Sequence, residues 1–321
     1  MSWQQVCFDY DGSYPGFLTC VFESYAHREE AVCFTSPEED RLTLWPERHV
    51  DTDQAKAERV YRSLSKKISP QACRLVTQAF LTCLPERELH MYRFLRLGYQ
   101  RGADITRDLT DDRVHVLWKA VQHLGSEAHL LKGFLRFSDQ QGVLVGEIEP
   151  KNRVLPLLRP HFCTRYSGEH FLIYDRTHRE LLIHQPGRWA ILPAEDFAPA
   201  PPGQEEVTYR RLWRRFYDTI AIRERENPRC RMNHMQKKYW KNMVEMTLPP
   251  TPDDIALPTR PLTSPLPTRE NAAIGAVQPR QAANRRAHLP AGNGLPDIDA
   301  SPPISEEDGQ HEPHVQSLKQ R

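Results

Sequence analysis

GFLRFSDQQGVLVGEIEPK (133–151) and HFLIYDRTHRELLIHQPGRWAILP (170–193) decide the fold of this chain. In both stretches, short runs rich in Val, Ile, Leu and Phe flank a polar turn. Such runs predict β-hairpins, with turns at 140–142 and 176–178. The segment between them, RVLPLLRPHFCTRYSG (153–168), predicts a short helical or irregular crossover. We therefore expect an antiparallel sheet of about four strands with helices packed on one face.

The chain before this sheet is dominated by helical patterns. FLTCVFESYAHRE (17–29) carries apolar residues at helical spacing and follows an Asp11-Gly12-Ser13 turn. One short strand, AVCFT (31–35), comes next. Four more helices are predicted, with Thr52 or Asp53 as the N-cap of the first, at 50–67, 75–84, 86–99 and 111–124. The fold class is therefore α+β with a helical N-terminal block.

The last block, 207–246, predicts basic helices. An aromatic and aliphatic stripe from Tyr209 to Ile220 recurs at helical spacing, and we expect it to face the core. Arginines fall between the positions of the stripe. RCRMNHMQKKYWKNM (229–243) continues the basic character.

The near-neutral total charge hides this basic block. The 321 residues hold 43 Lys/Arg and 42 Asp/Glu, a net charge of +1. Residues 207–243 alone hold 11 Lys/Arg and 3 Asp/Glu, a local charge of +8, which leaves −7 for the rest of the chain. A basic stretch of this kind predicts an anionic partner for that stretch.

The composition changes abruptly after residue 247. Residues 249–321 lack Phe, Tyr and Trp and hold 13 of the 27 prolines. Such a segment buries too little apolar surface to offset the entropy of ordering it. We therefore predict a single domain over 1–247 and a disordered, Pro-rich tail over 248–321.

The ends and the cysteines indicate a cytoplasmic protein. The N-terminus has no basic segment followed by an apolar one, so no secretory signal is expected, and no apolar run is long enough to cross a membrane. The seven cysteines are widely spaced and odd in number. We expect free thiols rather than a disulfide framework, a zinc site or an iron–sulfur cluster.

Several strings resemble one family in a common order. The most specific is YDGSYPGFLTCVFESY (10–25). The others are VDTDQAKAERV (50–60), FLRLGYQRG (94–102), EAHLLKGFLRF (127–137), EPKNRVLPLLRPHF (149–162), IYDR (173–176) and HMQKKYWKNM (234–243). Together they resemble an uncharacterised prokaryotic family called "probable DNA metabolism protein".

This resemblance implies work on DNA. Members that look like this chain accompany a radical-SAM protein of DNA modification or repair, and some are fused to a uracil-DNA-glycosylase-like domain. The resemblance thus implies a radical-SAM partner and a DNA-repair context, with a glycosylase-like protein as a further partner. It covers about residues 5–247, and the sequence shows no glycosylase-like domain.

The best residue-level indication of a nucleic-acid partner lies in the basic block. Lys and Arg neutralise phosphates and release counterions, and aromatic rings stack on exposed bases. The candidate nucleic-acid-binding residues are Lys132, Arg136, Arg229, Arg231, Lys237, Lys238, Tyr239, Trp240 and Lys241. The alternative is that the stripe from Tyr209 to Ile220 faces the core and that its arginines pair with the surplus acids elsewhere in the fold.

Catalytic candidates are few. His129 and His161 could act as general bases, or could be satisfied by hydrogen bonds at packed junctions. Glu149, with Glu147, Lys151 and the more distant Asp139, resembles the metal-binding core of restriction-type nucleases. Pro150 fits poorly inside a central strand. The spacing of His and Cys predicts no metal site, and we expect no cofactor.

Three functions follow as hypotheses. The first is a DNA-associated accessory protein that acts with the radical-SAM partner in repair or modification. The second is a nucleic-acid-processing enzyme, linked to nuclease or glycosylase chemistry. The third is a protein-interaction scaffold that makes no contact with DNA and that uses the 209–220 stripe and the tail.

Overall fold

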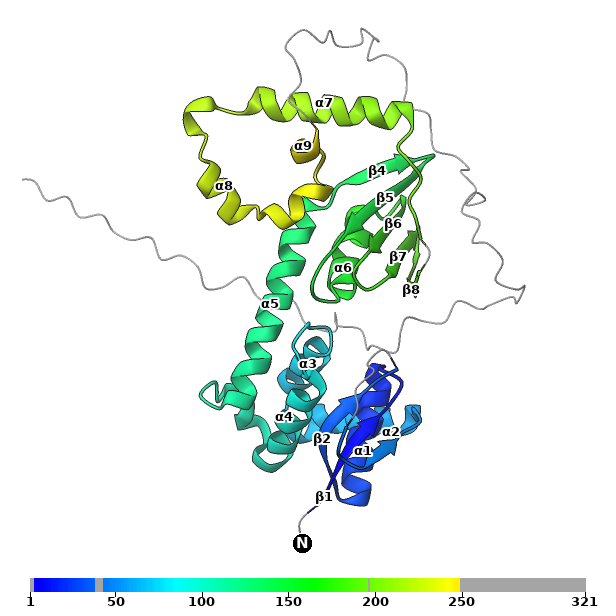
Figure 1. Cartoon of the computed structure of the whole chain (residues 1–321), viewed down its shortest axis with the longest axis vertical. Helices are drawn as coiled ribbons and strands as arrows, with labels where there is room; N and C mark the ends of the chain where they lie inside the picture. The colour runs from blue at the N-terminus through cyan, green and yellow to red at the C-terminus, as the bar shows by residue number, and fades with distance from the viewer. Residues whose placement is uncertain (1–2, 38–42, 196, 249–321) are drawn as a thin grey trace, which may run out of the picture.

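The computed structural model describes residues 3–37, 43–195 and 197–248 (Figure 1). Helices and strands are mixed, so the predicted α+β class is confirmed in outline. The tail prediction for 248–321 lies outside the described residues, apart from Leu248. The prediction of one domain over 1–247 stays a prediction.

A parallel sheet of three strands opens the fold. β1 (Gln4–Asp9) lies between β2 (Glu29–Thr35) and β3 (Glu47–His49). The prediction of a helical N-terminal block with one short strand therefore needs correction. β3 is too short to show alternation in the sequence, and parallel pairing joins segments that are distant along the chain.

The predicted Asp11-Gly12-Ser13 turn is confirmed between β1 and α1 (Tyr14–His27). The Asp11 carboxylate accepts the Ser13 N–H at 2.9 Å and the Thr52 hydroxyl at 2.8 Å. Ser13 in turn caps the helix by accepting the Gly16 N–H at 3.0 Å. The most specific string of the sequence thus fixes the entry of α1.

Helices close the first core against this sheet. They are α2 (Gln54–Ser63), the π-helical turn η1 (Leu64–Ile68), α3 (Pro70–Ala79), α4 (Arg87–Arg101), η2 (Gly102–Arg107) and α5 (Asp112–Phe134). Asp53 caps α2 by accepting the N–H groups of Ala55 and Lys56, which settles the choice between Thr52 and Asp53. α5 runs well past the predicted end at residue 124 and links two cores: Leu117 belongs to the first and Leu124 and Leu131 to the second.

The second sheet contains both predicted hairpins and one feature that the sequence did not predict. Its order is β4 (Phe137–Gln140), β5 (Val143–Ile148), β6 (His170–Asp175), β7 (Glu180–Gln185) and β8 (Arg188–Pro193). The β4–β5 and β6–β7 hairpins are antiparallel, but β5 and β6 run parallel. The predicted all-antiparallel sheet of about four strands therefore needs correction.

Two local features explain the difference. The predicted crossover is α6 (Leu155–Arg165), which returns the chain across the sheet so that β6 runs in the direction of β5. A further turn at Gly187, which has a φ of 77°, adds β8 to what the sequence pattern presents as one hairpin. Gly tolerates this left-handed conformation because it has no Cβ.

The last block runs along one end of the second sheet. It contains α7 (Gln204–Ile220), η3 (Arg223–Arg225), α8 (Pro228–His234), η4 (Lys237–Asn242) and α9 (Val244–Thr247). In Figure 1, α7 crosses the end of the molecule next to β4, and the first core lies at the opposite end of α5. Tyr239 and Met243 complete the second core, so this block is anchored on α5.

The cysteines correct one expectation. Cys7 and Cys33 are partners in the β1–β2 register, with their Cα atoms 4.7 Å apart, and form a disulfide. The prediction of free thiols is therefore wrong for this pair, because their separation of 26 residues conceals the parallel pairing. The other five cysteines are free.

Within the described part of the chain, the helices lack the combined length and apolar character that a membrane crossing requires. The cytoplasmic location stays a prediction.

Candidate nucleic-acid interface

Lys238 is held by a buried carboxylate on α5. Glu127 is 3% exposed, and its carboxylate accepts the Lys238 ammonium at 3.2 Å. It also accepts the backbone N–H groups of Lys151 at 3.1 Å and Asn152 at 2.9 Å, and the Asn152 side-chain amide at 2.7 Å. Lys238 therefore stabilises a network that joins α5, η4 and the end of β5.

This network sets the charge of Glu127. Burial alone would raise the pKa of Glu127, but the hydrogen bonds from Asn152, Lys151 and Lys238 together lower it below its usual range. Glu127 is therefore ionised at neutral pH. Asn152 extends the network by accepting the N–H of Cys83 at 2.9 Å, which connects it to the loop after α3.

Arg136 is likewise engaged inside the fold. The Glu245 carboxylate is 1% exposed and accepts the Arg136 guanidinium, with Nε at 3.2 Å, and the Trp213 indole N–H at 3.1 Å. Burial opposes ionisation of Glu245, but Arg136 and Trp213 lower its pKa. The sequence predicts that Arg136 contacts phosphate, but in the structure this side chain already has an internal carboxylate partner.

Lys241 and Tyr239 are also engaged within the fold and are not free to bind nucleic acid. Lys241 forms an ion pair with Glu149. The Tyr239 ring is 6% exposed, with its centroid 5.3 Å from that of Phe134 and the Lys238 ammonium 4.7 Å from its own centroid. A ring buried in this way offers no open face for base stacking in the folded protein.

Two of the remaining predicted residues of this block, Arg231 and Lys237, lie around Trp240, and Arg229 lies two residues before Arg231. The indole ring is half-buried and donates its N–H to the Met235 carbonyl at 2.9 Å. The cationic groups of Arg231 and Lys237 lie 5.7 and 5.9 Å from the ring centroid. Arg229 is exposed in the first turn of α8. We call Arg229, Arg231, Lys237 and Trp240 the Trp240 surface.

The Trp240 surface keeps its positive charge. Among the described residues, no ion pair engages Arg229, Arg231 or Lys237, in contrast to Lys238 and Lys241. Uncompensated cations around a partly accessible aromatic ring are the combination that single-stranded nucleic acid requires.

Lys132 lies on a separate basic face. It is exposed near the end of α5, while His161 and Arg165 lie on α6, which packs against α5. Burial first, and then Lys132 and Arg165, lower the pKa of His161, so the imidazole is neutral at neutral pH. His129 is exposed on α5.

The structure does not assemble the proposed catalytic candidates. Within the described residues, no hydrogen bond or ion pair connects His129, His161 and Glu149. Asp139 accepts the Gly142 N–H in the β4–β5 turn, whereas Glu147 and Glu149 lie at the other end of β5. Glu147 and Glu149 instead face Arg176, at 3.3 and 3.9 Å. In the described part of the chain, no group of three His, Cys, Asp or Glu side chains could hold a metal ion.

Asp175 shapes the β6–β7 turn. One carboxylate oxygen accepts the N–H groups of Thr177 and His178, and the other contacts His178 Nδ1 at 2.7 Å. Glu180 lies opposite Asp175 in the register and is paired with Arg153. Burial raises the pKa of Glu180, because the ionised form is poorly solvated there.

The exposure of the apolar stripe on α7 corrects the prediction that this stripe faces the core. The sequence predicts that Tyr209 to Ile220 face the core, yet Tyr209, Trp213, Phe216 and Ile220 are all exposed, Phe216 by 52%. Trp213 and Phe216 lie 5.7 Å apart, ring to ring. The amphipathic pattern correctly predicted the helix, but an apolar stripe does not specify whether the fold or a partner covers it.

Glu127, Asn152 and Glu245 were missed by the sequence analysis. Each is polar and nearly fully buried. Glu127 and Glu245 form ion pairs with Lys238 and Arg136, two residues that the sequence predicted to bind nucleic acid. The available signal for Glu127 was its position among the buried apolar residues of a helix at 124, 128 and 131. A carboxylate in that pattern needs a cationic partner.

The fold and this interface define an α+β protein that carries a basic C-terminal block on a long connecting helix. Residues 85–245 match the model of the DUF4130 family, a domain of unknown function, and the chain belongs to that family. The matched segment begins just before α4 and ends within α9, so it includes the second sheet and the Trp240 surface. No curated protein matches the chain.

Proposed function

We propose that this protein is a nucleic-acid-associated accessory protein. The observation that carries the proposal is the Trp240 surface, where Arg229, Arg231 and Lys237 are free of carboxylate partners among the described residues. The charge of the segment that matches the family also supports the proposal. Residues 85–245 hold 27 Lys/Arg and 21 Asp/Glu, a net charge of +6, whereas the whole chain has a net charge of +1.

A DNA-repair or DNA-modification role with a radical-SAM partner is part of this proposal. It rests on the sequence resemblance to the DNA-metabolism family, which also suggests a uracil-DNA-glycosylase-like protein as a further partner. The exposed α7 stripe supports the need for a protein partner, because four large apolar side chains along one helix face remain accessible.

Binding to single-stranded DNA tests the nucleic-acid part. The Arg229→Ala/Lys237→Ala variant should lower the slope of log affinity against log salt for fluorescein-labelled dT30, by up to ~1.4 for two lost phosphate contacts. Lys119→Ala/Arg188→Ala removes the same charge from exposed positions on α5 and β8 and serves as the control. If both variants bind as the parent does at every salt concentration, the Trp240 surface is not a nucleic-acid interface.

Co-purification tests the partner part. The radical-SAM partner that the resemblance implies should co-purify with the chain after nuclease treatment, and Tyr209→Ser/Phe216→Ser should reduce the yield of the pair. Both side chains are more than half exposed, so the fold should tolerate the change. Loss of the complex on nuclease treatment alone would show that DNA, and not the helix face, bridges the two proteins.

A further inference from the structure

A second basic segment lies in the first core, hidden by the negative charge of the rest of the chain. Residues 54–74 hold six Lys/Arg and a single acid, Glu58, for a local charge of +5. This segment covers α2, η1 and the start of α3 and lies outside the family match at 85–245.

The π-helical turn η1 presents two lysines to solvent. Leu64 and Ile68 anchor its ends in the core, both almost fully buried. Between them, Lys66 and Lys67 are exposed. The anchor is tight, because Ile68 packs so closely on Gly98 of α4 that a Cβ there would lie 2.7 Å from Ile68 Cδ1. The two lysines are therefore displayed on a rigid support.

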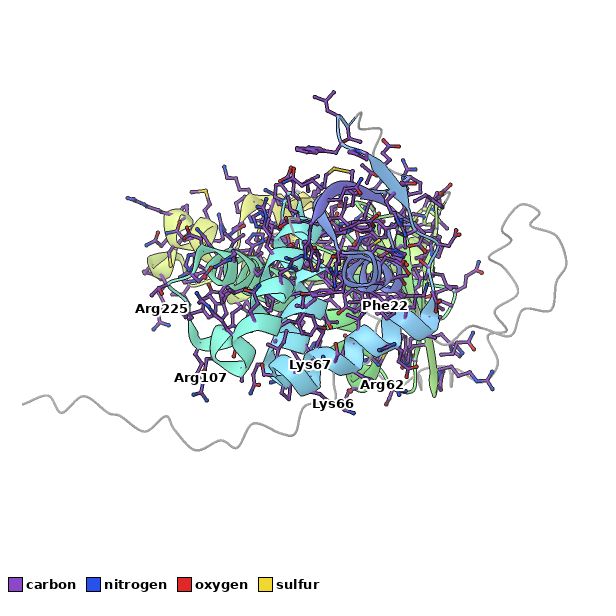
Figure 2. The ribbon with its side chains drawn as sticks, turned by 90° about the horizontal axis from the view of Figure 1, so that it is seen from below. Phe22, Arg62, Lys66, Lys67, Arg107 and Arg225 are labelled. Atoms are coloured by element: carbon purple, nitrogen blue, oxygen red, sulfur yellow. A yellow bond between two sulfur atoms is a disulfide. The ribbon has the colours of Figure 1, made fainter. Side chains whose placement is uncertain are left out.

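Neighbouring cations extend this surface. η2 packs beside η1 and ends at the exposed Arg107. Arg59 is exposed on α2, with its guanidinium 5.5 Å from the centroid of the Phe22 ring. Figure 2 shows Lys66, Lys67 and Arg107 along the same border of the molecule. We call Arg59, Lys66, Lys67 and Arg107 the Lys66 surface.

These four cations have no ionic partner within the described residues. The nearby Arg62 is different, because it pairs with Glu58 on the next turn of α2. A cluster of uncompensated cations on a rigid support attracts a polyanion. α2 and η1 expose no large apolar side chain, which an amphipathic helix needs in order to insert into a membrane surface.

The two basic surfaces lie toward opposite ends of α5. η2 ends at Arg107, four residues short of the start of α5 at Asp112, whereas Tyr239 of η4 packs on Phe134, the last residue of α5. At 1.5 Å rise per residue, the 23 residues of α5 separate these ends by roughly 34 Å. Figure 1 shows α5 as the connection between the two parts of the fold.

We propose that the Lys66 surface binds the phosphodiester backbone of the same nucleic acid that contacts the Trp240 surface. The protein would then hold one strand at two points along α5. This inference rests on the proposed function, because it assigns a second contact to the same ligand. An unstacked single strand is longer per nucleotide than the ~3.4 Å of a duplex strand, so about 10 nucleotides are more than enough to reach from one end of α5 to the other.

Oligonucleotide length separates one contact from two. dT4 is shorter than the roughly 34 Å of α5 even when fully extended, so it engages one surface at a time, whereas dT30 reaches both. The salt dependence of binding by the parent protein should therefore be steeper for dT30 than for dT4. Lys66→Ala/Lys67→Ala should lower the dT30 slope by up to ~1.4 and remove the excess over dT4. Lys66→Gln/Lys67→Gln, which keeps the side-chain length, should do the same.

The outcomes distinguish this inference from the proposed function. If Lys66→Ala/Lys67→Ala matches the parent with dT30 while Arg229→Ala/Lys237→Ala does not, the Lys66 surface is no nucleic-acid contact and the proposed function stands. If neither variant differs from the parent, both fail. If the lysine variant loses only binding to vesicles rich in phosphatidylserine, the surface binds lipid and the inference is wrong. Melting curves and the Lys119→Ala/Arg188→Ala control verify the fold and the charge effect.

Discussion

Glu127→Ala should destabilise the protein more than the substitution of an exposed glutamate does. The carboxylate is 3% exposed and accepts two donors of Asn152, a residue that is itself 1% exposed. Each buried donor left without a partner costs about 1–3 kcal/mol, so the loss should be about 2–6 kcal/mol. Lys238 is 38% exposed and can rehydrate, so its freed ammonium adds less than about 1 kcal/mol.

Urea unfolding followed by circular dichroism measures this loss. Glu127→Gln should cost less than Glu127→Ala, because it keeps one accepting oxygen. Glu58→Ala is the matched control, since Glu58 is 59% exposed and its pair with Arg62 should contribute within about 0.5 kcal/mol. A loss below about 1 kcal/mol for Glu127→Ala would refute the argument that this network holds α5, η4 and the end of β5 together.

Three further predictions concern stability and thiol chemistry. The pKa of Glu245 is lowered, so its stabilisation is complete above its ordinary pKa of 4.5 and is lost as the pH falls through the lowered pKa. Glu245→Gln should therefore flatten the fall in melting temperature below about pH 5, and an unchanged profile would contradict this. Gly16→Ala would place a methyl group 2.2 Å from a carboxylate oxygen of Asp11, so its melting temperature should fall; an unchanged value would show that the turn adjusts freely. Iodoacetamide should label the exposed Cys83 and spare Cys20, whose pKa is raised by burial, and equal labelling measured by peptide mass spectrometry would argue against the packing of α1.

Local patterns accounted for the parts of the fold that depend on nearby residues. The two hairpins, the crossover at 155–165 and the Asp11 turn were predictable because alternation and turn residues are contiguous in the chain. The parallel pairing of β1 with β3 was not, because β3 has only three residues and its partner lies about 40 positions away. The exposure of the α7 stripe was equally hidden, since periodicity describes a helix face and not what covers it.

The candidate site shows the same limit. Charge counting located the basic block, and the alternative was that the arginines of the 209–220 stripe pair with acids elsewhere in the fold. Internal pairing instead engages Lys238 of the block and Arg136 outside it, whose partners Glu127 and Glu245 lie 111 and 109 positions away along the chain. Arg229 and Lys237 keep their charge free among the described residues, so the candidate surface is smaller than the sequence indicated and is centred on Trp240.

The salt dependence of single-stranded DNA binding by the parent protein tests the central claim most directly. Fluorescence anisotropy with labelled dT30 should show saturable binding, and the logarithm of the affinity should fall linearly with the logarithm of the salt concentration. The slope should be about −2 or steeper, since three cations of the Trp240 surface each contribute ~0.7. Absence of binding at low salt, or an affinity that does not change with salt, would contradict the account.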